Sequence, residues 1–410
     1  MIVKHIDLTD FRNYGRLDLD VGPSVNVFYG NNAQGKTNII EAINVASSVS
    51  SHRTSKDKEM IRFGTDEFKI NLLCEDEVYD SDINFKVTFT DNGKRGLVKR
   101  VLEQNNLVIP KISSYIGTFN TVIFAPDDLN LVKGAPVSRR KFLNLLICKV
   151  SPVYFDLLGR TKKITEQKNA CLKACHGKYT PDCDNKLDYW DFSLSDLSAD
   201  LIIERFRYCL LLSSKAAAHH SVISDGKEKL IVEYDTLTGV KELFEEFLKR
   251  DGMLDQFTSG TLSGGILAQI KRGLSDLLLK KFRSVRESDI EKGLSSTGVQ
   301  RDDLEIKLNG LSMRQYSSQG QQRSAALALK LSELEILREK VRSSPVLLLD
   351  DVFSELDESR RISLLAGMNN AQIFITCTDK AFVESQLGNI VTGSSDVKFY
   401  RVEKGEVFPN

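Results

Sequence analysis

The segment from Gly30 to Thr37 reads Gly-Asn-Asn-Ala-Gln-Gly-Lys-Thr, which is a complete G-x-x-x-x-G-K-T phosphate-binding loop. Its glycines let backbone N–H groups wrap around phosphate oxygens, Lys36 can reach the β- and γ-phosphates, and the Thr37 hydroxyl can bind Mg²⁺. Residues 24–29 are typical of the strand before such a loop, and residues 38–43 of the helix after it, whose N-terminus favours negative charge. The spacing therefore predicts an ATP site rather than a plain glycine turn. The residues expected to hold the nucleotide are Gly30, Asn31, Asn32, Ala33, Gln34, Gly35, Lys36, Thr37 and Asn38.

A second group of candidate residues lies near the carboxyl end of the chain, where the apolar run 345–349 ends in Asp350 and Asp351. Phosphate-loop ATPases need a carboxylate at the end of such a strand to hold magnesium. We therefore expect Asp350 to hold Mg²⁺ through water, and Asp351 to polarise the attacking water. Residues 352–357 follow directly, and Asp357 is assigned to the same nucleotide site.

Length and composition limit the classes of protein that the chain can belong to. A chain of 410 residues can bury a large core and divide into two or more domains. Its 56 basic and 56 acidic residues cancel, so any basic surface for nucleic acid must be a local patch. The sequence contains no secretory signal pattern and no apolar run of membrane-spanning length, and its seven cysteines form no secreted disulfide framework. We expect a cytoplasmic protein without membrane partners.

Alternating apolar and polar residues predict strands at 68–74, 82–90 and 96–103, with Asp91-Asn92-Gly93 as a tight turn. These strands would form an antiparallel meander beside the nucleotide-binding sheet. Residues 302–308 also read as a strand, which we expect to re-enter this first lobe.

The middle of the chain is predicted to be helical. Residues 153–174 form one long helix, and a second carries an apolar stripe at steps of three and four: Leu187, Trp190, Leu194, Leu197 and Leu201. Arms of roughly 30 to 35 residues reach only about 50 Å, and no heptads are sustained, so a long coiled coil is not expected. The expected fold is α/β, with an ATPase lobe from residues 1–125 and 296–410 and an inserted, mainly helical second lobe from 126–295.

A small polar loop, residues 316–323, opens a predicted helix that leads into the Asp350 strand, and it resembles the signature of the ABC ATPase superfamily. In that superfamily a signature serine and glycine contact the γ-phosphate held by a second subunit. The resemblance assigns this contact to Ser318, Gln319, Gly320 and Gln321. Residues 262–265, Leu-Ser-Gly-Gly, match the commoner form by letter, but their helix does not lead into that strand, so we interpret them as an ordinary helix start.

Within the superfamily the chain resembles the RecF family of bacterial recombination mediators over nearly its whole length. The resemblance rests on these segments: 11–14, 30–38, 51–54, 126–129, 133–136 with Arg139 and Arg140, 301–304, 318–323, and Asp350-Asp351. The chain departs from the family pattern at Gly298-Val299-Gln300, where Gly-Pro-His is usual. At the position of the transporters' switch histidine stands Thr378, as in the RecF family, and it is assigned to the nucleotide site.

The resemblance implies an ATP-dependent homodimer on double-stranded DNA at gaps and junctions. It further implies slow, DNA-stimulated ATP hydrolysis as a switch, with Lys36, Ser318 and Asp351 as catalytic residues. Cooperation with RecR and RecO in loading RecA would serve gap repair, SOS induction and replication restart. The alternatives are a transporter ATPase subunit, a head of a chromosome-organising or break-repair complex, and a nucleotide-sensing scaffold without hydrolysis.

For several charged and sulfur-containing residues the sequence allows two interpretations. Arg12 is expected to contact phosphate, because a guanidinium fork matches phosphate oxygens, whereas Arg53 faces either nucleotide or water. DNA contacts are expected from patches that are equally readable as solvated surface: Arg139, Arg140 and Lys141, or Lys162 and Lys163. For the group Cys171, Cys175, His176 and Cys183, structural cysteines in an exposed loop are favoured over a zinc site, because the spacing matches no usual ligand pairs.

Overall fold

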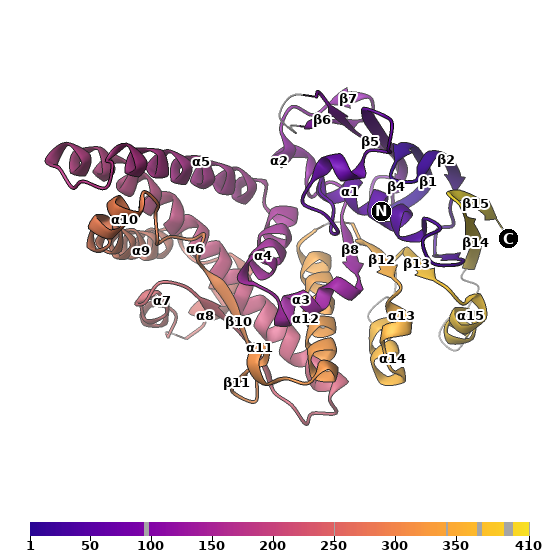
Figure 1. Ribbon diagram of the computed structural model, residues 1–410. Helices are drawn as coiled ribbons and strands as arrows, with labels where there is room; N and C mark the ends of the chain where they lie inside the picture. Colours follow the sequence, from indigo (N-terminus) through magenta and orange to yellow (C-terminus); the bar gives the residue numbers. More distant parts are fainter. Residues whose placement is uncertain (94–97, 250, 342, 367–370, 389–396, 410) are drawn as a thin grey trace. The chain divides into compact units, whose positions relative to one another are not determined.

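The computed structural model describes residues 1–93, 98–249, 251–341, 343–366, 371–388 and 397–409 (Figure 1). The chain folds into two units. Unit 1 comprises Met1–Leu129, His219–Lys227 and Ser318–Asn410, and unit 2 comprises Asn130–Ala218 and Glu228–Ser317. These boundaries differ from the expected ranges, because residues 296–317 belong to unit 2 instead of the ATPase lobe.

One sheet of unit 1 carries the predicted nucleotide-binding strands. Its order is β15-β14-β3-β13-β12-β8, and neighbouring strands are parallel except for the edge strand β15. The strands are β3 (Val25–Tyr29), β8 (Thr121–Phe124), β12 (Val346–Asp350), β13 (Ile373–Cys377), β14 (Val397–Glu403) and β15 (Glu406–Pro409). Every residue of β12 and β13 is buried, which explains their continuous apolar sequence.

The second sheet of unit 1 is the predicted antiparallel meander, which the structure confirms. Its order is β2-β1-β4-β5-β6-β7. The strands are β1 (Ile2–Phe11), β2 (Tyr14–Asp20), β4 (Glu67–Asp76), β5 (Ser81–Asp91), β6 (Val98–Gln104) and β7 (Leu107–Val108). Alternate residues of β4 are buried, in agreement with its two-residue period. The helix α1 (Lys36–Ser48) contacts strands of both sheets, and its buried isoleucines fill the space between them.

Short helices and α12 complete unit 1. The helix α12 (Gln319–Lys340) leads into β12, as predicted for the signature helix. The other elements are η1 (Asp57–Met60), α2 (Ile112–Tyr115), η2 (Pro126–Asp128), α13 (Val352–Glu355), α14 (Glu358–Ala366) and α15 (Lys380–Gly388).

Unit 2 is mainly helical and has a small sheet of its own. β10 (Asp303–Leu308) pairs with β9 (Leu230–Asp235) and β11 (Leu311–Ser312), so the prediction that residues 302–308 re-enter the first lobe was wrong. Apart from Leu129 and residues 219–223, which belong to unit 1, its helices are α3 (Leu129–Lys133), α4 (Pro136–Val150), α5 (Pro152–Ala174), α6 (Pro181–Ile223), α7 (Val240–Leu248), α8 (Met253–Ser259), α9 (Gly264–Ser284), α10 (Arg286–Lys292) and α11 (Met313–Tyr316). α5 has 23 residues and α6 has 43, so α6 is longer than expected and spans about 65 Å at 1.5 Å per residue.

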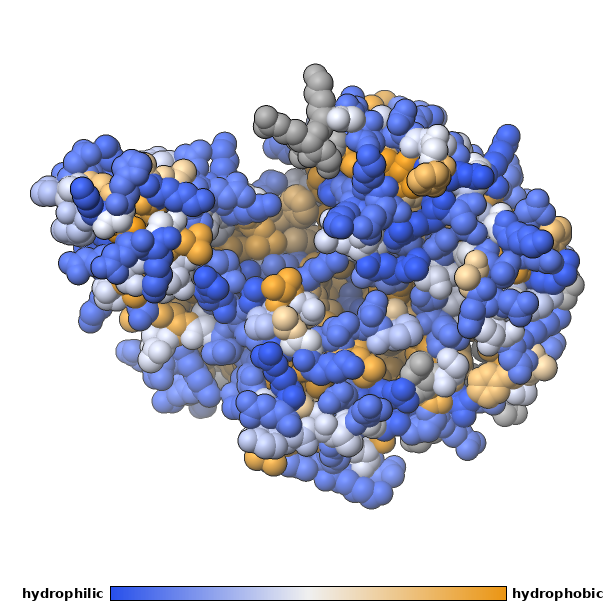
Figure 2. Space-filling view, in the orientation of Figure 1, coloured by the Kyte–Doolittle hydropathy of each residue, from blue (hydrophilic) through white to orange (hydrophobic). Residues whose placement is uncertain are grey.

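Hydrophilic residues cover most of the face seen in Figure 2, and hydrophobic residues come through as small separate patches. Within the described residues, no helix is long and apolar enough to cross a bilayer.

Candidate nucleotide site

The phosphate-binding loop, residues 30–35, connects β3 to α1 and depends on two glycines. Gly30 has φ 149°, and a Cβ there would lie 2.4 Å from the Val402 carbonyl oxygen. Gly35 has φ 117°, and a Cβ there would lie 2.7 Å from Asn13 Nδ2. Because both positions combine a positive φ with a close approach, only glycine fits them without strain. The loop therefore has the backbone shape that the motif predicts.

Hydrogen bonds from neighbouring segments of the chain position this loop. The Tyr14 hydroxyl donates to the Gly35 carbonyl oxygen (3.2 Å), and Asn13 Nδ2 donates to the Gln34 carbonyl oxygen (3.1 Å). From the β14–β15 hairpin, the backbone N–H of Lys404 donates to Gln34 Oε1 (2.7 Å). These positioning roles were not predicted from the sequence, although Asn13 and Tyr14 lie within the family segment 11–14.

The Lys36 side chain contacts the backbone at the start of the loop. Its Nζ donates to the carbonyl oxygens of Gly30 and Asn31, both at 2.7 Å. Burial lowers the pKa of Lys36, while the negative charges of Asp351 and Asp350 act in the opposite direction. The ammonium group therefore lies where the loop surrounds a bound phosphate, with the helix N-terminus behind it.

Thr37 and Asp350 meet at the carboxyl edge of the sheet. β13 lies between β3 and β12, so the ends of these parallel strands face one edge, where ligands of open α/β sheets bind. The Thr37 hydroxyl donates to Asp350 Oδ1 at 2.8 Å, and the buried Thr376 hydroxyl donates to the same oxygen at 2.8 Å. The role of Thr376 was not predicted. Thr378 follows β13 at this edge and is exposed.

The Thr37 and Asp350 oxygens suit a magnesium ion. Mg²⁺ takes oxygen ligands and usually keeps several waters, so the Thr37 hydroxyl can bind it directly, while Asp350, which accepts a hydrogen bond from that hydroxyl, can hold it through water. Burial raises the pKa of Asp350, partly offset by the hydrogen bonds from Thr37 and Thr376. A buried carboxylate whose charge is disfavoured gains from a cation beside it. We expect Thr37 and Asp350 to hold Mg²⁺.

This burial yields a first prediction, on Asp350→Asn. A group whose pKa is raised in the folded state loses stabilising energy as the pH rises through that raised value. Without nucleotide, we therefore expect Asp350→Asn to unfold about 2 °C above wild type at pH 8. The difference should disappear at a pH low enough to protonate Asp350, since asparagine Oδ1 still accepts from both threonines.

Thermal unfolding across pH tests this expectation, with the exposed Asp379→Asn as the matched control. Mg²⁺-ATP should stabilise wild type and Asp379→Asn but not Asp350→Asn, because Asp350, unlike Asp379, is expected to hold the metal. A wild-type gain on adding Mg²⁺-ATP in Asp350→Asn would contradict the metal assignment.

Asp351 adopts a left-handed backbone conformation (φ 53°) at the start of α13. Its N–H donates to the Thr376 hydroxyl oxygen (3.0 Å), and the Ser354 hydroxyl lies within hydrogen-bond distance of both its carbonyl oxygen (2.8 Å) and its carboxylate (3.2 Å). Asparagine and aspartate tolerate this conformation better than most residues. The backbone thus fixes the direction of a carboxylate next to Asp350, as a water-positioning residue requires.

Arg12 and Arg53 share one buried acid. Arg12 forms a two-pronged ion pair with Glu41 (2.6 and 2.9 Å), and Arg53 Nη1 lies 3.2 Å from the same carboxylate. Glu41 is fully buried; burial would raise its pKa, but hydrogen bonds from Arg12 and Ser51 bring it below its usual value. Arg53 also donates to Asn38 Oδ1 (2.8 Å), which ties it to the start of α1. Glu41 therefore positions both arginines, a role that the sequence analysis missed, and contact of Arg12 with phosphate stays a prediction.

The signature segment caps α12. The Ser318 hydroxyl accepts from the Gln321 N–H (3.3 Å), and Gln321 Oε1 accepts from the Ser318 N–H (2.9 Å), which forms a capping box. Arg360 donates to the Gly320 carbonyl oxygen (2.9 Å) and pairs with Asp357. Asp357 is thereby tied to the signature through Arg360, a connection that the sequence did not indicate.

The hydrogen bonds of Ser318 stay within the first turn of α12, and its contact with a nucleotide stays a prediction. By contrast, Ser263 caps α9 in unit 2, where its hydroxyl accepts from the Ile266 N–H (3.4 Å). Residues 262–265 are thus an ordinary helix start, as interpreted from the sequence.

Two of the basic residues proposed to contact DNA form hydrogen bonds within unit 2. Arg139 is buried and forms a two-pronged pair with Asp303 (2.6 and 2.8 Å), so its assignment as a surface contact was wrong. Arg140 donates to the Asp302 carbonyl oxygen (2.6 Å). Lys162 and Lys163 are exposed on α5, and their contact with DNA stays a prediction.

The cysteines near the end of α5 pack as apolar residues. Cys175 is buried with Leu172, Leu187 and Ile290, and Cys171 and Cys183 pack against this cluster. All seven cysteines are free, and across the described ranges no three His, Cys, Asp or Glu side chains are arranged to hold a metal ion. This packing gives the cysteines a structural role.

Comparison with known proteins identifies the family. The model of the RecF/RecN/SMC N-terminal domain matches residues 2–398. The chain is similar to "DNA replication and repair protein RecF" of Agathobacter rectalis, with 36% identity over 99% of both chains. The protein of the same name from Bacillus subtilis is 37% identical over 92% of this chain and 93% of the relative.

Similar solved structures point to the same family. One described as the recombination mediator protein RecF-ATP in the RecFOR pathway has a TM-score of 0.83 and 31% identity, covering 100% of this chain and 97% of that one. An Smc head domain from Pyrococcus furiosus has a TM-score of 0.51 at 12% identity, covering 100% of this chain and 96% of that one, which shows the shared fold alone. The chain belongs to the RecF family.

Proposed function

We propose that this chain is an ATP-dependent DNA-binding protein of DNA replication and repair, which dimerises on ATP and uses slow hydrolysis as a timer. The single observation that supports this most is the convergence of Thr37 and Asp350 at the end of the phosphate-binding loop, 2.8 Å apart although 313 positions separate them in the chain. The family's RecF-ATP structure and its DNA-repair names support the same proposal.

The chain's own residues divide the work at this site. The loop N–H groups and Lys36 bind the β- and γ-phosphates, and Thr37 and Asp350 hold Mg²⁺. When bound, Mg²⁺ neutralises charge on the phosphate oxygens. Asp351 orients the attacking water, and Ser354 holds the carboxylate of Asp351 in place.

Dimerisation follows from the position of the signature. Ser318 and Gly320 begin α12, and the N-terminus of that helix favours an anion. A second copy would supply the γ-phosphate to this helix end, and two chains would share two composite sites. Binding of ATP would then assemble the dimer that holds DNA.

The DNA and protein partners belong to the same proposal. Double-stranded DNA at gaps and junctions would bind through local basic patches, since the chain carries no net charge. RecR and RecO are the proposed partners in loading RecA, in keeping with the RecFOR pathway named for the similar structure.

Ser318→Arg tests the dimer. The added side chain would occupy the position of the partner's γ-phosphate without touching the chain's own loop. We expect ATP affinity of the monomer within about twofold of wild type, with loss of ATP-dependent dimerisation and hydrolysis. Mixing with Lys36→Ala subunits should restore at most one of the two composite sites.

Gel filtration with ATP, ADP and no nucleotide measures this. Ser385→Arg, which adds the same side chain at an exposed serine of α15, is the matched control and should dimerise normally. If Ser318→Arg dimerises with ATP like Ser385→Arg, the interface has been assigned to the wrong surface.

A further inference from the structure

A cavity in unit 2 is not used by the ATP site. Its volume is about 290 Å³, at the lower end of the range for ligand sites. It lies between the loop after β9, helix α9 and the loop that precedes β10. The side chains that matter below are Asp235, Thr238, Lys281, Ser296, Thr297 and Arg301.

A network of buried polar contacts fixes the loop that precedes β10. The Ser295 N–H donates to Asn169 Oδ1 of α5 (2.8 Å), and the Ser296 N–H donates to Asp289 Oδ1 of α10 (3.0 Å). Arg205 of α6 donates to the Val299 carbonyl oxygen (2.7 Å). Three helices therefore hold this loop in one conformation.

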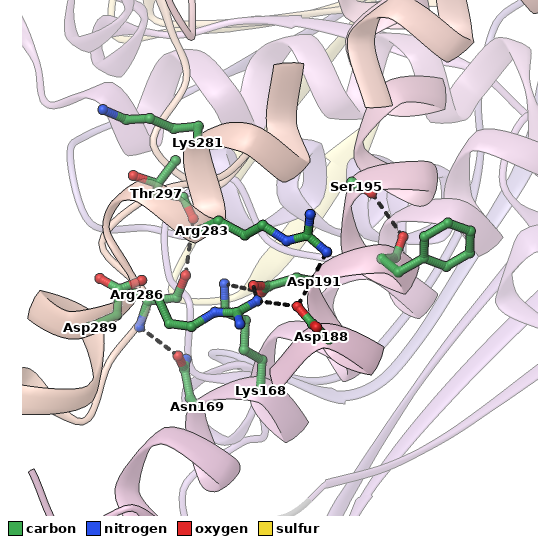
Figure 3. Close-up of polar contacts among 12 residues, drawn as sticks. Lys168, Asn169, Asp188, Asp191, Ser195, Lys281, Arg283, Arg286, Asp289 and Thr297 are labelled. Atoms are coloured by element: carbon green, nitrogen blue, oxygen red, sulfur yellow. Dashed lines mark hydrogen bonds and ion pairs between the residues drawn. The ribbon is translucent and has the colours of Figure 1, made fainter. Parts of the chain in front are cut away.

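The same region is braced by buried charges. Arg286 lies between Asp188 and Asp191, with a distance of 2.7 Å to each, and Lys168 lies 2.7 Å from Asp191 (Figure 3). These pairs join α5, α6 and α10. Such extensive support suits a loop whose exact shape matters for binding.

The departure from the family pattern contributes to the loop's shape. Gly298 has φ 134°, a conformation that favours glycine, and Gln300 Nε2 donates to the Thr297 carbonyl oxygen (3.0 Å). The Arg301 N–H donates to the Gly298 carbonyl oxygen (2.9 Å) and closes a turn. This turn presents Thr297 and Arg301 on the lining of the cavity.

The lining has unused donors. Lys281 and Arg301 have no carboxylate within 4 Å among the residues that the structure describes. In the same described part of the chain, the hydroxyls of Thr238, Ser296 and Thr297 make no hydrogen bond. Lys281 and Thr297 are drawn next to one another in Figure 3. Two cations and three hydroxyls thus surround a space of ligand size.

The acids on the lining do not cancel these cations. Asp302 is buried and bonded to Arg205, Tyr234 and Thr236, so its charge is already compensated. Asp235 is the remaining carboxylate, and burial and the neighbouring Asp303 and Glu305 raise its pKa. A ligand that carries a proton donor beside an anionic group could donate a hydrogen bond to the Asp235 carboxylate.

We propose that this cavity binds a phosphate group through Lys281, Arg301 and the three hydroxyls. A phosphate presents three or four oxygens, which matches cations and hydroxyls that come from three separate segments, whereas a carboxylate presents only two. Two sources share this chemistry: the backbone of bound DNA, which rests on the function proposed above, and a free phosphate or nucleotide, which does not.

The variant that tests the site is Lys281→Ala/Arg301→Ala. Both side chains are exposed, and within the described part of the chain neither is paired with a carboxylate, so the fold should survive their removal. The matched control is Arg272→Ala/Lys280→Ala, which removes two exposed cations of α9 that do not line the cavity. Circular dichroism and thermal unfolding of both variants should match wild type.

The first arm measures free ligands. Inorganic phosphate and AMP are titrated calorimetrically into Lys36→Ala protein, because that substitution silences the phosphate-binding loop. If the source is a free ligand, binding should weaken about tenfold or more in the cavity variant and stay unchanged in the control.

The second arm measures duplex DNA binding with ATP as a function of salt. If DNA supplies the phosphate, the cavity variant should bind all sequences about tenfold more weakly, and its salt slope should fall by about one per protomer. Failure of wild type to bind DNA would overturn the proposed function. The calorimetric titration of the first arm would then be the test of whether the cavity binds phosphate. If the cavity variant equals the control in both arms, the phosphate site is refuted.

Discussion

Lys36→Ala is expected to reduce ATP affinity by at least about 100-fold. The lysine supplies charge-assisted hydrogen bonds to the β- and γ-phosphates, and each such bond contributes about 1.5–3 kcal/mol. Its Nζ already lies inside the loop, 2.7 Å from the carbonyl oxygens of Gly30 and Asn31, so little reorganisation is needed to reach a phosphate. ATP-dependent dimerisation should be abolished with the affinity.

Calorimetry with ATP and gel filtration measure these two effects. Lys69→Ala, which removes an exposed lysine from β4 of the same unit, should behave like wild type. Wild-type ATP affinity in Lys36→Ala would remove the basis for placing ATP at this loop.

Asp351→Asn is expected to slow hydrolysis by about 10²–10⁴-fold while ATP still binds. Asparagine keeps the size of the side chain, tolerates φ 53°, and can still accept the hydrogen bond from Ser354. The variant therefore loses the charge that orients the attacking water and little else. The ATP-bound dimer should persist.

Dissociation from a labelled gapped duplex measures the consequence. Because ligands stabilise the state that binds them, DNA should stay bound longer to Asp351→Asn than to wild type in ATP, and equally long in ADP. Asp379→Asn, at an exposed position after β13, serves as the control. Equal dissociation rates in ATP would mean that hydrolysis does not time release, and equal turnover would remove Asp351 from the chemistry.

The secondary structure around the candidate ATP site was predictable from local sequence. The loop at residues 30–37 and the strand ending at Asp350 each combine a continuous segment with a secondary-structure context, so their types and order suffice. The meander was predictable for the same reason, since the alternation of buried residues in β4 is a property of neighbouring residues.

The ion-pair partners of the charged side chains could not be predicted from the sequence. The ion pair of Arg12 with the buried Glu41 of α1 was not predicted, and contact of Arg12 with phosphate stays a prediction. Arg139 was assigned to DNA, but the fold buries it against Asp303, 164 positions away. A charged residue looks the same in sequence whether it faces water or a buried acid, and only packing distinguishes the two.

Strand pairing was the other feature left open. Residues 303–308 were correctly predicted as a strand but placed in the wrong lobe, because a strand's own residues do not determine which edge it pairs with. The pairing with β9 brings Asp302 to Arg205 and completes the loop beside the cavity. The sequence alone thus determined the phosphate-binding loop, the strand that ends at Asp350 and the long helices in the middle of the chain, all of which depend on contiguous residues. The tertiary structure decided the pairing of the arginines, the anchoring of the loop by Asn13, Tyr14 and Thr376, and the cavity of unit 2, because these depend on contacts between residues distant in the chain.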